Sequence, residues 1–216
     1  KGKETINGKP GALASLKPNM SLPATARKAF PLAAVTFVCT WSLGGFFQAF
    51  GPAMAREQLH SSSALAAALV FASIMAPGSI GASLAGRMHA VTAQKLGMLS
   101  FTIAVMVLLW TLDFGNLTLF LIVSVITGIA QGTVLAGSIQ TMVADLLITE
   151  RAGVLSVIYA SSYTGAAIPT LVAGKMSEEF SLLQVASGYG VMAILGCLAV
   201  FLVPALSRRG KPHEVH

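Results

Sequence analysis

Several polar and aromatic side chains of this chain occur inside long apolar stretches, at spacings that place them on one face of a helix. Trp41 and Gln48 are seven positions apart, and Tyr159 and Tyr163 are four apart, so each pair shares a helical face. Primary amides donate and accept hydrogen bonds, and aromatic rings offer flat faces to apolar or cationic groups. We therefore predict a binding site for a small organic molecule. The candidate contact residues are Trp41, Gln48, Gln131, Ser138, Tyr159 and Tyr163.

Gln131 and Ser138 belong to a longer polar stripe. The residues Ser124, Thr127, Gln131, Ser138 and Thr141 are separated by three, four or seven positions, which puts them along one side of a helix. The competing interpretation for Gln131 is a hydrogen bond to a neighbouring helix, worth about 1 kcal/mol in a membrane. For the aromatic candidates the competing interpretation is packing between helices. The residue types alone leave both interpretations open.

The elements that must position these residues are membrane-spanning helices. The composition is 55% hydrophobic and only 10% charged, which is typical of membrane proteins. A spanning helix needs about 20 mostly apolar residues, and six long intervals of the sequence lack Asp, Glu, Lys and Arg. We therefore predict an all-α membrane protein with six transmembrane helices and no soluble domain. The predicted helices are 30–54, 64–85, 96–112, 117–142, 152–174 and 183–206, within a domain 29–207 that lies between a flexible basic cytoplasmic linker (1–28) and a cytoplasmic tail (208–216).

Basic residues predict the orientation of these helices. They cluster in the linker, the tail and alternate loops, whereas only Arg56 and Lys175 fall in the other loops. Because Lys and Arg near helix ends stay on the cytoplasmic side, both termini are predicted to be cytoplasmic. The net charge of +6 then reflects topology and attraction to the lipid bilayer, with no nucleic acid as a partner.

Glycine and proline predict where the helices bend and pack. One run of small residues begins at Gly78, directly after a predicted kink at Pro77, and another runs from Gly128 through Gly132. Small side chains let two helix backbones approach closely, and proline bends a helix because it lacks an N–H group. The predicted kink and packing positions are Pro77, Gly78, Gly128, Gly132, Gly165 and Pro169.

The polar stripes also predict which helices surround the binding site. In lipid, a polar stripe must face protein or a water-filled cavity. We therefore expect the first, second, fourth and fifth predicted helices to enclose a cavity. The third and sixth are apolar around most of their circumference, and we expect them to be peripheral.

Charged residues gather at the predicted cytoplasmic helix ends. Asp145, Glu150 and Arg151 form a charged turn before the fifth predicted helix, and Arg87 follows the second. Charges at helix termini can favour one of two states of a gate, although solvated loop charges ordinarily serve topology and solubility. The predicted gating positions are Gly86, Arg87, Asp145, Glu150 and Arg151.

Other residue patterns argue against catalysis and metal binding. The four histidines lie in predicted loops or in the tail, without the spacing of metal ligands. Cys39 and Cys197 lie far apart in apolar stretches, which favours packing over a disulfide. No predicted span contains a carboxylate or a nucleophile with a neighbouring base. We predict no enzymatic activity, no cofactor and no signal peptide.

Four short motifs occur along the chain. Glu4-Thr5 is similar to the end of a P-E-T sequence, and the stretch 82–87 (ASLAGR) is similar to G-x-L-A-D-R, with Gly86 in place of the acidic residue. The stretch 150–153 (ERAG) is similar to E-R-x-G, and Gly165, Pro169 and Gly174 are similar to a glycine-proline motif of antiporters. With these motifs and its short loops, the chain resembles the C-terminal half of a major facilitator superfamily transporter.

The resemblance implies two six-helix halves around a substrate site near the membrane midplane, with alternating access by rocking of one half against the other. An N-terminal six-helix half, in the same polypeptide or a partner chain, would complete the cavity. The implied function is transport of a small-molecule substrate, with an efflux or drug-type carrier favoured, across the plasma (bacterial inner) membrane. The alternative is a six-helix membrane protein that homodimerises as a channel or acts as a structural or interaction subunit.

Overall fold

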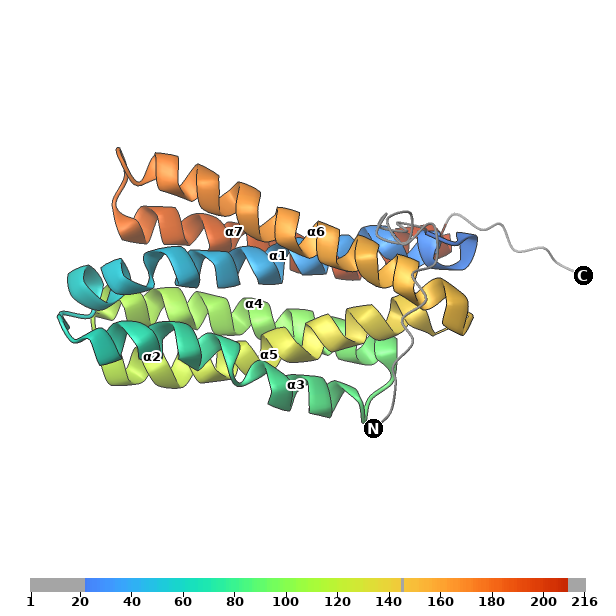
Figure 1. Ribbon diagram of the computed structural model, residues 1–216, viewed down its shortest axis with the longest axis horizontal. Helices are drawn as coiled ribbons and strands as arrows, with labels where there is room; N and C mark the ends of the chain where they lie inside the picture. Colours follow the sequence, from blue (N-terminus) through green and yellow to red (C-terminus); the bar gives the residue numbers. More distant parts are fainter. Residues whose placement is uncertain (1–21, 145, 210–216) are drawn as a thin grey trace, which may run out of the picture.

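The computed structural model describes residues 22–144 and 146–209, and every regular element in this part of the chain is a helix. The helices lie side by side as a bundle (Figure 1). They form six spans that are long and apolar enough to cross a membrane. Two spans combine two elements each, α1 with η2 and α2 with α3, and α4, α5, α6 and α7 form one span each. The chain is therefore an all-α, multi-pass membrane protein, as predicted. The elements are α1 (Ala24–Ala53), the π-helix η2 (Met54–Gln58), α2 (Ala64–Met75), α3 (Gly78–Ala85), α4 (Ala90–Phe114), α5 (Leu117–Val143), α6 (Ile148–Met176) and α7 (Leu182–Arg209).

The helices extend beyond most of the predicted boundaries. α1 begins at Ala24, so Arg27 and Lys28 are helical although they were assigned to the linker. α4 includes Lys95 near its start and Asp113 near its end. Charged side chains are tolerated in such terminal turns because they can reach the membrane surface, and charge-free intervals therefore underestimate helix length. Most of the predicted linker and most of the predicted tail lie outside the described residues.

A tight connection joins α4 to α5. Gly115 has a φ of +73° and follows the end of α4, a backbone conformation that favours glycine because other residues carry a Cβ. The next residue, Asn116, precedes α5, and its side-chain oxygen accepts a hydrogen bond of 2.9 Å from the backbone N–H of Leu119. This cap satisfies one free N–H group at the start of the helix. The two helices are thus held as an antiparallel pair.

At the predicted kink, Pro77, the structure has a break between α2 and α3. α2 ends at Met75, and α3 begins at Gly78. The Ser79 hydroxyl donates a hydrogen bond of 3.1 Å to the carbonyl oxygen of Ala76 in the break. This bond gives a partner to a carbonyl oxygen within the break.

The two predicted runs of small residues pack against each other. A Cβ on Gly132 of α5 would lie 2.0 Å from the carbonyl oxygen of Gly78, and one on Gly81 would lie 1.9 Å from the carbonyl oxygen of Ile129. Both distances are far below van der Waals contact, so α3 and α5 touch backbone to backbone. Gly81 was not among the predicted packing positions. Gly86, in the motif at the end of the same helix, makes no comparably close contact.

The burial of the helices differs in one respect from the prediction. Half of the α4 span is buried, against 22% of the α6 span and 28% of the α2–α3 span. α4 is therefore not peripheral: it packs against α5 on one side and α7 on another (Figure 1). Its outer face still exposes apolar side chains such as Ile103 and Trp110. α6 and α2–α3 are the least covered spans because each packs along few neighbours.

Candidate functional site

A pocket of about 500 Å³ lies between α1, α2–α3, α5 and α6. These are the four spans that the polar stripes predicted around a cavity, and α4 and α7 contribute no lining residue. Four of the six predicted contact residues line it: Trp41, Gln48, Gln131 and Tyr163. Trp41, Gln131 and Tyr163 lie near the middle of their helices. The pocket is therefore at the middle depth of the bundle.

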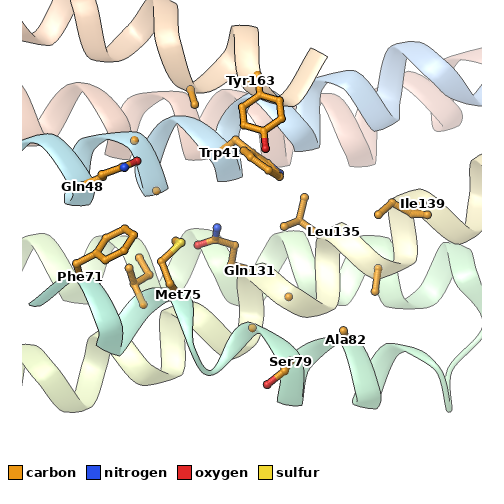
Figure 2. Close-up of a pocket in the computed structure, with 17 residues that line it drawn as sticks. Trp41, Gln48, Phe71, Met75, Ser79, Ala82, Gln131, Leu135, Ile139 and Tyr163 are labelled. Carbon is orange, nitrogen blue, oxygen red and sulfur yellow. The ribbon is translucent and has the colours of Figure 1, made fainter. Parts of the chain in front are cut away.

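Gln131 extends from α5 into the pocket towards α1 (Figure 2). Its side chain is only 7% exposed, and its Oε1 atom is buried without a hydrogen-bond partner among the described residues. A buried amide oxygen without a partner costs about 1 to 3 kcal/mol relative to a paired one. The competing interpretation was a hydrogen bond between Gln131 and a neighbouring helix, and Oε1 accepts no such bond from the described residues. The oxygen is available to a donor on a bound molecule.

Two aromatic rings form the side of the pocket opposite Gln131. The rings of Trp41 and Tyr163 meet edge to face, with centroids 5.1 Å apart and planes at 67°. Figure 2 shows both rings beside the space between α1 and α5. Tyr159 stacks on Tyr163 with a centroid distance of 6.4 Å, but it is not a lining residue. Tyr159 is therefore one helical turn removed from the predicted site.

The break between α2 and α3 supplies a second part of the lining. Met75 comes directly before the break, Gly78 and Ser79 directly after it, and Phe71 one turn earlier. The kink was predicted, but the positions of Met75 and Phe71 in the lining were not. Because apolar residues are common throughout the predicted helices, only the position beside Pro77 could have indicated them.

Ser138 does not line the pocket, which corrects the prediction for this residue. Its hydroxyl is fully buried and lies 2.7 Å from the Thr36 hydroxyl of α1. It also accepts a hydrogen bond of 3.1 Å from Nε2 of Gln94 in α4. Ser138 therefore connects three helices beside the pocket. Gln94 was missed because it precedes the charge-free interval from which this helix was predicted.

The predicted gating residues that the structure describes do not form a cluster of ion pairs. Arg87 and Arg151 are exposed, and neither takes part in an ion pair within the described ranges. Glu150 accepts a hydrogen bond of 3.1 Å from the backbone N–H of Leu147 and so caps the start of α6. Gly86 lies in the turn after α3. Asp145 lies outside the described residues, and a gating role stays a prediction for all five positions.

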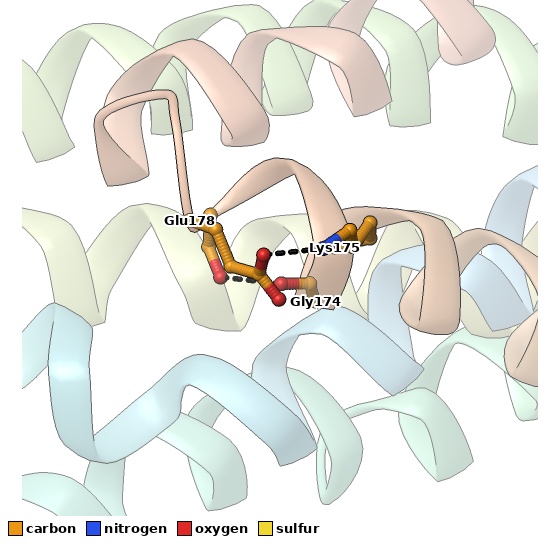
Figure 3. Close-up of polar contacts among 4 residues, drawn as sticks. Gly174, Lys175 and Glu178 are labelled. Carbon is orange, nitrogen blue, oxygen red and sulfur yellow. Dashed lines mark hydrogen bonds and ion pairs between the residues drawn. The ribbon is translucent and has the colours of Figure 1, made fainter.

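An ion pair does occur at the other end of α6. Lys175 and Glu178 are paired at the surface, and the Ser177 hydroxyl donates a hydrogen bond of 2.8 Å to the carbonyl oxygen of Gly174 (Figure 3). The two charged side chains are 77% and 61% exposed, so the pair contributes little to stability. These contacts lie at the end of the helix and away from the pocket.

Gly165 and Pro169 hold α6 in place. A Cβ on Gly165 would lie 2.7 Å from the Cα atom of Val38, so α6 approaches α1 closely at this glycine. Pro169 lies within the continuous helix α6, and its carbonyl oxygen accepts a hydrogen bond of 3.2 Å from the Tyr189 hydroxyl of α7. The helix that carries Tyr163 is thereby fixed from two sides.

No cluster of three or more His, Cys, Asp or Glu side chains that could hold a metal ion occurs in the described part of the chain. Cys39 and Cys197 are free thiols. No protein-family model, curated protein or solved structure matches the chain. Inference about function therefore depends on the pocket and its side chains.

Proposed function

We propose that the chain is the C-terminal half of a secondary transporter of the major facilitator superfamily type, which moves a small organic solute across the plasma (bacterial inner) membrane by alternating access. The single observation that carries this proposal is the pocket at middle depth with the unpartnered amide oxygen of Gln131. A polar atom left without a partner inside a membrane protein is costly. Its retention there is explained if a solute provides the partner.

The size and lining of the pocket suit a small organic solute. Ligand pockets commonly measure about 300 to 1,000 Å³ and combine an apolar lining with a few polar groups. This pocket measures about 500 Å³. Its lining includes two amide side chains, Gln48 and Gln131, and two hydroxyl side chains, Ser79 and Tyr163. The broken α2–α3 span beside the pocket also supports the proposal, since interrupted helices commonly form the substrate sites of transporters.

The poorly covered faces of two spans support a partner half. Ile168, Leu171 and Val172 of α6 are 57%, 74% and 53% exposed. Leu65 of α2 and Ile80 of α3 are 68% and 53% exposed. Both spans border the pocket, so a second six-helix half placed over them would cover apolar surface and close the pocket. A second copy of the chain could cover the same faces, and labelling of the pocket from each side of the membrane separates the two arrangements.

Access to the pocket from the two sides of the membrane tests the proposal. The variant Ala136→Cys places a thiol in the pocket lining, in a background where Cys39 and Cys197 are replaced by Ala. The full-length protein in sealed vesicles is treated with a membrane-impermeant maleimide on one side at a time. Ala199→Cys is the matched control, because Ala199 is also half-buried but lies in a groove between α1 and α7.

Alternating access predicts that the thiol of Ala136→Cys is labelled from either side and that conditions which speed labelling from one side slow it from the other. The thiol of Ala199→Cys should stay unlabelled. A homodimeric channel would give labelling rates that rise or fall together, accompanied by ion conductance. A structural subunit would leave the pocket thiol unlabelled from at least one side. Either of these last two results would refute the proposal.

A further inference from the structure

We infer that the solute of this pocket is uncharged, with an aromatic or otherwise flat apolar body and an N–H or O–H group that donates a hydrogen bond to Oε1 of Gln131. The inference rests on the proposed function, because it names the substrate class of the same pocket.

The requirement for a donor follows from the surroundings of Gln131. Its Oε1 atom is buried and accepts no hydrogen bond from the described residues. A site with a buried acceptor discriminates strongly against an analogue that lacks the matching donor, because binding that analogue leaves the acceptor unpaired. A carbonyl or ether oxygen on the solute cannot meet this need, since it also only accepts. The matching group is therefore an N–H or O–H.

Gly44 provides the space beside the amide. A Cβ on Gly44 would lie 3.0 Å from Cε of Met75 and 3.9 Å from Nε2 of Gln131, so both side chains converge on this glycine from the far side of the pocket. Met75 has a flexible, unbranched side chain. We expect movement of this side chain to open space for a solute beside the Gln131 amide. Any side chain larger than glycine at position 44 would occupy part of that space.

The part of the lining that this chain provides carries no charge that could pair with a charged solute. No Asp, Glu, Lys, Arg or His side chain lines the pocket in the described part of the chain. A charged solute would lose its hydration here without gaining an opposite charge from this chain, which is costly in a mostly apolar site. The aromatic surface of Trp41, Phe71 and Tyr163 instead suits a flat ring, because aromatic rings pack favourably face to edge or in offset stacks.

Fluorescence of Trp41 provides a direct binding assay. The sequence contains two tryptophans, Trp41 and Trp110, and Trp110 is exposed on α4 away from the pocket. In a Trp110→Phe background, quenching therefore reports on Trp41 within this chain; any tryptophan in a further segment of the full-length protein is likewise replaced by Phe. The probes are 2-quinolone, which is uncharged and has a lactam N–H, its N-methyl derivative, which lacks the donor, and the 1-methylquinolinium cation.

We expect saturable quenching by 2-quinolone, with the N-methyl derivative and the cation each binding at least about tenfold more weakly. In Gln131→Met the preference for 2-quinolone over its N-methyl derivative should fall to about threefold or less, because the acceptor is gone. Gly44→Ala should weaken 2-quinolone binding about tenfold, since one methyl group in a pocket has effects of this size. Gly51→Ala is the matched control on the same helix: its Cβ would make only ordinary contacts, at 3.7 Å or more.

The inference is overturned if 2-quinolone does not quench saturably, if the N-methyl derivative or the cation binds as well, or if Gln131→Met leaves the discrimination unchanged. Alternating maleimide access to the thiol of Ala136→Cys combined with any of these results would refute the solute class but leave the proposed transport function intact. Selective binding of 2-quinolone without alternating access would support the solute class but refute the proposed transport function.

Discussion

Replacing Gln131 by methionine should make the unliganded protein more stable, although it removes the main polar group of the pocket. Gln131 is 7% exposed, and its Oε1 atom lacks a hydrogen-bond partner within the described residues. Met has a similar size and shape but no group that needs a hydrogen bond, so packing should be nearly conserved. An unpaired buried acceptor costs about 1 to 3 kcal/mol, and Gln131→Met should recover a similar free energy.

The measurement is thermal unfolding of the purified full-length protein in lipid nanodiscs without added solute. For a chain of this length, 1 kcal/mol corresponds to a change in Tm of about 2 to 4 °C, so the expected increase is about 2 to 12 °C. Gln48→Met is the matched control. Gln48 lines the same pocket but is exposed, and its replacement should change the free energy of unfolding by less than about 0.5 kcal/mol.

A decrease in Tm for Gln131→Met, or a change no larger than that for Gln48→Met, would refute the reasoning. Either result would mean that the Gln131 amide is already paired in the unliganded protein, by water or by a partner segment. The oxygen would then not be available as an unpaired acceptor for a solute. Higher stability combined with lost solute discrimination is characteristic of a binding residue. Removing a structural hydrogen bond would instead lower the stability of the protein.

Three further substitutions test the packing and the charged ends. Gly132→Ala should abolish folding or destabilise the protein by more than about 3 kcal/mol, because its Cβ would lie 2.0 Å from the carbonyl oxygen of Gly78. Gly174→Ala is the control, because no atom lies within 4 Å of its Cβ. Equal expression of the two variants would contradict the contact between Gly132 and Gly78. Ser138→Ala should cost about 1 kcal/mol in thermal unfolding, since it removes hydrogen bonds to α1 and α4; an unchanged Tm would refute this. Arg87→Gln should change Tm by less than about 2 °C, because Arg87 forms no ion pair within the described ranges; a larger loss would indicate a partner such as the predicted gating charges.

The division into spans could be predicted from the sequence because it depends on local composition. Apolar length alone identified six helices, and Pro77 identified the break in the second, since a proline disrupts its own helix whatever surrounds it. The helix ends were less well predicted. Lys95 and Asp113 are helical because charged side chains in terminal turns can extend to the membrane surface, an option that a search for charge-free intervals excludes.

The site could be predicted only in part. Helical periodicity placed Gln131 and Ser138 on one stripe, and the tertiary structure separates their roles. Gln131 enters the pocket beside Gly44, whereas Ser138 is covered by Thr36 and Gln94 from two other helices. Likewise, Tyr163 lines the pocket while Tyr159, one turn away, does not.

The sequence by itself determined that this is a six-span, all-α membrane protein with a broken second span and polar side chains within its helices. These properties follow from hydropathy, proline and periodicity, each of which acts over at most a few turns of one helix. Only the tertiary structure decided which polar atom remains without a partner. That outcome depends on what residues on other helices place opposite each side chain: glycine and methionine opposite Gln131, and a threonine and a glutamine opposite Ser138.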